Sequence, residues 1–147
     1  MAGFRGNYCH NMDSKGRVAL PAPFRKVLPD KVILVKGLHE ALFVFTDEEF
    51  ESWLDGFFGE GGFDPTNPRH DQIDTMVRGG SHEVPVDSAG RVNVPAQLRA
   101  DTHLGKSVTV IGKGNHIEMW DTDRWNAFMD AAPTLDELVF GKDQTSA

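Results

Sequence analysis

Cysteine and tyrosine are almost missing from this chain of 147 residues, which has one of each, Cys9 and Tyr8. A lone cysteine excludes a disulfide within the chain. No apolar run approaches the about 20 residues that a helix needs to cross a bilayer, and no basic and apolar leader opens the sequence. We therefore expect a cytoplasmic protein without a membrane segment.

Basic residues are in the minority, since 15 lysines and arginines face 22 acids and give a net charge of −7. This balance argues against a nucleic-acid partner, but the distribution matters more than the sum. Residues 1–40 hold seven of the bases and three of the acids, a net charge of +4, whereas residues 41–147 carry −11. A basic face on the first part could dock on phosphate, although uneven solvation would give the same numbers.

Signatures of catalysis are also lacking. His39-Glu40 and His82-Glu83 have no second histidine at the spacing of a zinc helix, and the six histidines do not fall at ligand spacing with one another or with Cys9. The stretch at residues 112–114 is too short for a phosphate loop. We therefore expect no enzyme, no metal, no cofactor and no small-molecule substrate; a hydrolase is the weakest alternative.

A duplicated segment is the strongest positive feature. Residues 13–25 read DSKGRVALPAPFR and residues 87–99 read DSAGRVNVPAQLR, with eight of thirteen positions identical. Self-similarity at a fixed offset decides the architecture. Two copies of about this size predict a fold with internal two-fold character, in which each half buries apolar surface that the other exposes.

Each copy predicts the same order of elements, namely a turn, a short strand, a short helix after a proline, a β-hairpin and a helix. The hairpins are expected over residues 32–45 and 108–120, and the helices that follow over residues 46–54 and from residue 121 or 122. Helical spacing places Trp125, Phe128 and Met129 in the core. Between the copies we expect a flexible loop at residues 56–66 and a linking helix between residues 67 and 80, with one short apolar turn at residues 135–140.

The spacing Asp-x-x-x-Arg occurs in both copies and is the best candidate for a binding site. Aspartate can close a turn on backbone amides, and a glycine tolerates the positive φ of such a turn. The arginine four residues on can then be held in a fixed direction, suited to forked contact with phosphate or a guanine edge. The alternative is that both arginines only tie their own halves together. The residues concerned are Asp13, Gly16, Arg17, Asp87, Gly90 and Arg91.

Several of these motifs resemble the MraZ family over residues 4–130. The matching stretches are FRG at 4–6, DSKGR at 13–17, LPAPFR at 20–25, DSAGR at 87–91, IEMW at 117–120 and the Asp121 to Trp125 spacing. The resemblance implies a bacterial transcriptional regulator related to the AbrB and SpoVT DNA-binding fold. The implied fold class is α+β, with two tandem swapped-hairpin AbrB-like units that form a pseudo-two-fold barrel with short helices.

The resemblance also implies which residues contact DNA. The family's DNA-contacting motif falls on residues 13–17, which makes Arg17 the first choice, Lys15 the second and Arg5 a third. In the second motif Ala89 replaces the lysine, so Arg91 is expected to have a mixed, partly structural role. Arg25 and Arg99, on the short helices, are expected to make internal contacts instead.

The committed organisation has four segments, residues 1–55 (the first, DNA-contacting repeat), 56–80 (loop and linking helix), 81–130 (the second repeat) and 131–147 (the tail). Two departures from the family pattern are the glycine-rich loop and the acidic linking helix with Asp71 and Asp74.

The function implied by the resemblance is that of a sequence-specific repressor, associated with the nucleoid. It would bind repeated double-stranded DNA sites upstream of the division and cell-wall gene cluster, which includes its own gene, as a ring-shaped homo-oligomer. The alternative is an antitoxin-like or scaffold module that uses the acidic second half to hold a protein partner.

Overall fold

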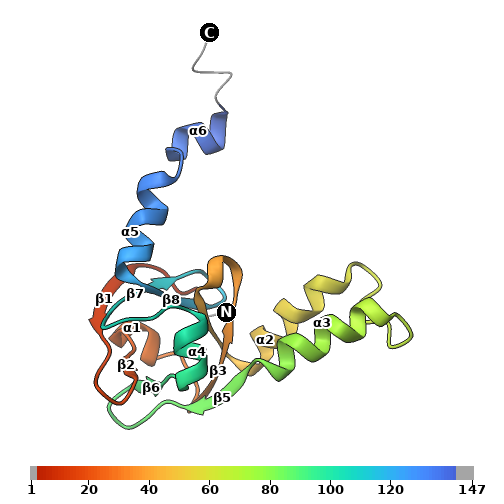
Figure 1. Ribbon diagram of the computed structural model, residues 1–147, viewed down its shortest axis with the longest axis horizontal. Helices are drawn as coiled ribbons and strands as arrows, with labels where there is room; N and C mark the ends of the chain where they lie inside the picture. The colour runs from red at the N-terminus through yellow and green to blue at the C-terminus, as the bar shows by residue number, and fades with distance from the viewer. Residues whose placement is uncertain (1–2, 142–147) are drawn as a thin grey trace.

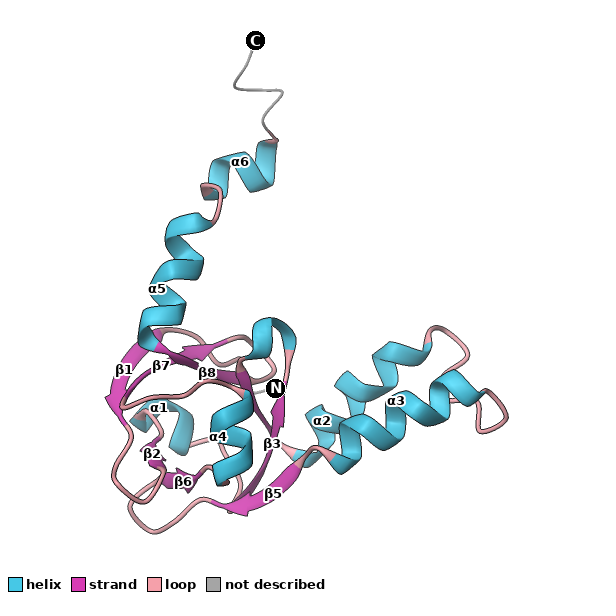
Figure 2. Cartoon of the chain, in the orientation of Figure 1, coloured by secondary structure: helices cyan, strands magenta, loops and turns pink. Residues whose placement is uncertain are grey.

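The computed structural model describes residues 3–141 as an α+β fold with antiparallel strand pairing (Figure 2). Residues 1–2 of the predicted first segment and residues 142–147 of the predicted tail lie outside this description. The strands are β1 (Asn7–Asn11), β2 (Arg17–Ala19), β3 (Lys31–Lys36), β4 (Leu42–Phe45), β5 (His82–Pro85), β6 (Arg91–Asn93), β7 (Ser107–Gly112) and β8 (Ile117–Asp121). The helices are α1 (Ala22–Arg25), α2 (Asp47–Asp55), α3 (Pro68–Gly79), α4 (Ala96–Asp101), α5 (Thr122–Ala131) and α6 (Leu135–Phe140), with short 3₁₀ helices η1 (Leu38–Glu40) and η2 (Gly56–Phe58).

The two repeats are interlocked by their strand pairing. A six-stranded sheet has the order β1-β7-β8-β4-β3-β5, and β2 pairs with β6 in a second, two-stranded sheet. Strand β1, before the first turn motif, therefore pairs with β7 of the second repeat, and β5, before the second motif, pairs with β3 of the first. Each half thus completes the sheet of the other, which confirms that the halves bury one another's apolar surface.

The predicted closed barrel is wrong. Strands β1 and β5 lie at the two edges of the six-stranded sheet, and only isolated bridges at Met12–Val18 and Val86–Val92 link it to the β2–β6 pair. The physical reason is the length of β2 and β6, which have three residues each. Because Pro21 and Pro95 follow closely and cannot donate to a ladder, these strands cannot extend into the larger sheet. The classification as tandem AbrB-like swapped hairpins stays a prediction.

Local sequence signals set the helix boundaries. The hydroxyl of Thr46 accepts a hydrogen bond from the backbone N–H of Glu49 at 3.2 Å, so α2 begins where the capping spacing predicted it. The side chain of Asn67 accepts from two backbone N–H groups of the first turn of α3, and Gly80 ends that helix. The predicted linking helix is therefore confirmed, and in the described residues no helix is long and apolar enough to cross a membrane.

The apolar core consists of two clusters on opposite faces of the six-stranded sheet. One cluster joins the sheet to β2, β6, α1 and α4, and its members Val18, Val92 and Val94 have no exposed surface. The other cluster lies under α2 and contains Phe43, Phe45 and Trp120. The loop after α2 is more ordered than its glycine content predicted, because η2 buries Phe58 to 9% exposure against the rings of Phe63 and His70.

Two arms project from the body (Figure 1). One is the α2–α3 helical hairpin, and the other is the α5–α6 segment that leads toward the C-terminus. The prediction that Phe128 and Met129 lie in the core is wrong, since they are 38% and 50% exposed, while Trp125 is half-buried against Trp120. The reason is that α3 follows α2 and packs Ile73 and Val77 into its cluster, whereas α6 leads away from α5 and leaves its apolar face open.

Candidate nucleic-acid interface

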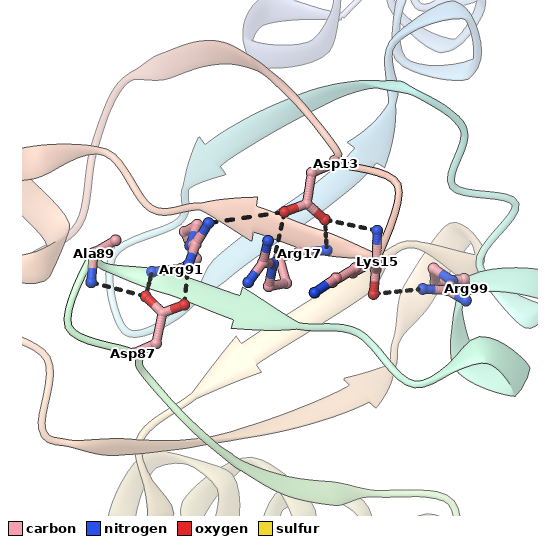
Figure 3. A network of polar contacts seen from close by, with 7 residues as sticks. All are labelled: Asp13, Lys15, Arg17, Asp87, Ala89, Arg91 and Arg99. Carbon is pink, nitrogen blue, oxygen red and sulfur yellow. Dashed lines mark hydrogen bonds and ion pairs between the residues drawn. The ribbon is translucent and has the colours of Figure 1, made fainter.

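The two motif arginines lie on one face of the β2–β6 ribbon. The antiparallel register pairs Arg17 with Asn93, Val18 with Val92 and Ala19 with Arg91. Successive side chains of a strand point to opposite faces. Because Val18 and Val92 are fully buried, Arg17 and Arg91 both point outward, beside one another (Figure 3). Their side chains are similarly exposed, at 30% and 33%.

Each arginine is held by the aspartate of its own turn. Oδ1 of Asp13 accepts hydrogen bonds from the backbone N–H groups of Lys15 at 3.0 Å and Arg17 at 2.9 Å, and Oδ2 lies 2.6 Å from Nε of Arg17. The backbone N–H of Arg17, followed by its guanidinium, holds the pKa of Asp13 below its ordinary value of 3.8. The carboxylate therefore stays charged and orients the arginine.

The second turn repeats this geometry. Oδ1 of Asp87 accepts from the backbone N–H groups of Ala89 at 3.0 Å and Arg91 at 2.9 Å, and Oδ2 lies 2.9 Å from Nε of Arg91. The backbone N–H of Arg91, followed by its guanidinium, lowers the pKa of Asp87 as well. A weaker ion pair of 3.9 Å between Nη1 of Arg91 and Oδ2 of Asp13 crosses from one repeat to the other. Both guanidinium groups are thus fixed at Nε, while their terminal nitrogens face outward.

Arginines from the helices reach across to the opposite turns. Nη1 of Arg99 donates to the backbone carbonyl of Lys15 at 3.4 Å, and Nη1 of Arg25 donates to that of Ala89 at 3.0 Å. The internal contacts predicted for these two residues are confirmed. Their partners lie 84 and 64 positions away in the chain, so no local sequence signal could have identified them.

The turn glycines make room for these crossing arginines. Gly16 and Gly90 have φ of +82° and +76°, a region in which residues with a Cβ are strained. A Cβ at Gly16 would collide with the guanidinium of Arg99, and one at Gly90 would collide with the side chain of Arg25. The carbonyl oxygens of both glycines also accept backbone hydrogen bonds, each of 2.9 Å, from the other repeat. Each turn is therefore locked by its partner repeat.

The structure gathers most, but not all, of the predicted contact residues. Lys15 is exposed on the first turn, beside Arg17 and near Arg91, and Ala89 is its counterpart on the second turn. Arg5 lies elsewhere, because its backbone packs against Gly112 at the far end of β1, whereas the end nearest the turn bonds to Lys106. The sequence gave no sign of this separation, since the register of β1 on β7 sets it.

The ribbon face is locally basic despite the acidic chain. Five cations lie on or against the two turns, Lys15, Arg17, Arg25, Arg91 and Arg99, with the carboxylates of Asp13 and Asp87 between them. Among the described residues, no three histidine, cysteine or acidic side chains gather as a metal site. The chemistry that this surface offers is guanidinium and ammonium contact with anions.

Acid is expected to weaken the two turns. Because the pKa values of Asp13 and Asp87 are lower in the folded protein than their ordinary value of 3.8, their contribution to stability is present above that value and is lost as the pH falls through the folded pKa values. Chemical denaturation of the wild type and of Asp13→Asn with Asp87→Asn, well above and well below pH 3.8, checks this. The variant should be less stable at the higher pH, and the difference should shrink at the lower pH. An equal difference at both would contradict the assignment.

Comparison with known proteins identifies the family. The sequence profile described as "MraZ protein, putative antitoxin-like" matches residues 4–67 and 77–137. The chain is 39% identical over 132 residues to a protein of Halothermothrix orenii, covering 88% of each chain, and 39% identical over 127 residues to one of Paenarthrobacter aurescens, covering 86% of this chain and 87% of that protein. A third, from Mycoplasmoides gallisepticum, is 35% identical over 128 residues, covering 87% and 88%. All three relatives are named transcriptional regulator MraZ, and the chain belongs to the MraZ family.

Proposed function

We propose that this protein is a transcriptional regulator that binds double-stranded DNA through the outer face of the β2–β6 ribbon. The observation that carries the proposal is that Arg17 and Arg91 stand side by side on that face, each fixed at Nε by an aspartate. The names of the relatives support it independently. In this reading residues 1–55 and 81–130 form the shared DNA-binding body, while residues 56–80 and 131–147 carry the helices outside it.

A two-stranded antiparallel ribbon has the dimensions of an element that enters the major groove of B-DNA. The terminal nitrogens of Arg17 and Arg91 can donate two parallel hydrogen bonds to the O6 and N7 atoms of guanine or to a phosphate. Lys15 has a compact charge on a flexible stem, suited to a phosphate at the rim of the groove. Arg5 is left outside the proposed contact surface because it lies at the opposite end of β1.

Self-association would multiply the effect of this small surface. The α5–α6 arm exposes apolar side chains, with Leu135 at 73%, Leu138 at 65% and Phe140 at 56% exposure. Such a contiguous apolar face is typical of a protein–protein contact. Several subunits in a ring could then engage adjacent DNA repeats, and linked binding can raise apparent affinity by about 10²–10⁴-fold.

The finer assignment follows the family resemblance. The sites would be repeats upstream of the division and cell-wall gene cluster, including the gene of this protein, with repression as the output and the nucleoid as the place of action. A mobility shift on the DNA immediately upstream of the gene, at about 50 mM and about 200 mM salt, tests the proposal. We expect binding that weakens at least about tenfold at the higher salt concentration, because phosphate contacts release counterions. Binding that ignores salt, or equals that to unrelated DNA, would refute it.

The second candidate is an antitoxin-like or scaffold module. It is favoured by the exposed apolar face of the α5–α6 arm and by the wording of the family description. It requires a stoichiometric protein partner that co-purifies with the chain, together with an absence of salt-sensitive DNA affinity in the same shift assay.

A further inference from the structure

A cavity of about 500 Å³ lies where the α2–α3 arm joins the sheet, away from the ribbon face. Its walls come from both parts, since Phe43 is on β4, Trp53 on α2, Phe57 on η2 and Val77 on α3. Small-molecule sites in proteins are mostly apolar concavities of about 300–1,000 Å³ with a few polar groups that fix orientation. This arm cavity has both properties, and the ribbon interface does not use it.

Aromatic rings form the wall of the arm cavity. Trp53 lies with its ring centroid 5.8 Å from that of Phe43 and 4.9 Å from that of Phe57, and His116 lies 4.6 Å from Phe43. Phe57 remains 45% exposed although it is large and apolar. An aromatic surface of this kind favours a flat, unsaturated guest, since rings pack edge-to-face or offset at such distances.

The charges at the rim favour an anion. Lys36 and Lys113 line the cavity with side chains 46% and 51% exposed. The acid that lines it, Glu118, is 8% exposed and already accepts hydrogen bonds from His116 Nε2 and Trp120 Nε1, both at 3.0 Å. Burial opposes its charge, yet these hydrogen bonds and Lys113 hold the pKa of Glu118 below its ordinary value.

The pairing of these groups leaves the lysine side chains free for a ligand. The contacts of Lys113 with Glu118 at 3.8 Å and of Lys36 with Glu40 at 3.9 Å are long, and Glu40 is also bound by His103 at 2.9 Å. A ligand anion could therefore approach both ammonium groups without breaking a short ion pair. A cation would meet two lysines and a carboxylate whose hydrogen bonds are already made.

We propose that the arm cavity is a binding site for a planar aromatic molecule with one anionic group, which stacks on Trp53 and Phe57 and directs its charge to Lys36 and Lys113. Because its walls belong to both the arm and the sheet, the ligand would fix the direction of the α2–α3 arm. The site is independent of the proposed DNA interface, since none of its residues lies on the ribbon.

Calorimetric titration of the full chain with 2-naphthoate and its neutral isostere 2-naphthamide tests this. Naphthoate should bind once per chain and about tenfold more tightly than the amide, as expected for one charge-assisted contact. Lys36→Ala combined with Lys113→Gln should remove that difference, and Val77→Trp, which fills the cavity, should abolish binding of both. Lys106→Ala, which changes an exposed lysine elsewhere, is the matched control, and melting curves establish that each variant folds.

The proposal is overturned if neither compound binds, or if Val77→Trp binds naphthoate as the wild type does. It is also overturned if binding appears only when dilution dissociates an assembly, measured by light scattering, because a second copy then occupies the cavity. Arg17→Ala should bind naphthoate normally, so a failure here and a failure of DNA binding are distinguishable.

Discussion

Replacing Arg17 and Arg91 together by alanine is expected to abolish specific DNA binding while the protein stays folded. Each guanidinium can make a bidentate contact worth about 1–3 kcal/mol, so each single substitution should weaken binding by about 10–100-fold. The two singles should be comparable because both side chains project equally from the same face. Mobility shifts on the upstream DNA at fixed salt measure the effect, and light scattering checks that the size of any assembly is unchanged.

Matched variants separate the forked contact from charge alone. Arg17→Lys keeps the charge but cannot donate in a fork, so it should retain non-specific affinity and lose discrimination between operator and unrelated DNA. Lys15→Ala should weaken binding to all sequences by a similar factor, as expected for a phosphate contact. Arg69→Ala, on the α3 arm, is the control and should bind as the wild type does. A wild-type shift from Arg17→Ala would show that DNA binds elsewhere.

Gly16→Val is expected to be among the most destabilising single substitutions in the chain. Gly16 has φ of +82°, and its missing side chain leaves the space that the guanidinium of Arg99 occupies. Placing a β-branched residue in this conformation costs about 1–2 kcal/mol in backbone strain, and the collision adds to it, so we expect a loss of about 2–4 kcal/mol. Thermal and chemical denaturation measure the loss, and DNA affinity should fall with it because the turn carries Arg17.

Gly59→Val provides the comparison for this prediction. Gly59 has φ of +83°, but a Cβ there would meet no atom within 4 Å. It should therefore show the backbone strain without the collision. Adding Arg99→Ala to Gly16→Val should recover part of the lost stability, since it removes the colliding group at the expense of one hydrogen bond of 3.4 Å. Equal losses at Gly16 and Gly59 would mean that the crossing arginine does not lock the turn.

Sequence reasoning succeeded where the interacting groups are close in the chain. Asp13 and Arg17 are four residues apart, and the cap of α2 joins Thr46 to Glu49, so residue type and spacing are enough to predict such contacts. It failed for Phe128 and Met129, whose helical spacing is correct for a core face. Periodicity identifies an apolar face but not what covers it, and here α6 leads away from α5.

The amino-acid sequence by itself determined the duplication, the two aspartate-closed turns, the order of the elements and the family. These depend on local hydrogen bonds, propensity and residue identity. Only the tertiary structure decided that Arg17 and Arg91 share a face, that Arg25 and Arg99 lock the opposite turns, that Arg5 lies apart and that the sheet stays open. The physical reason is that strand register and the exchange of strands between the repeats are set by packing between residues far apart in the chain, and short-range sequence patterns do not specify them.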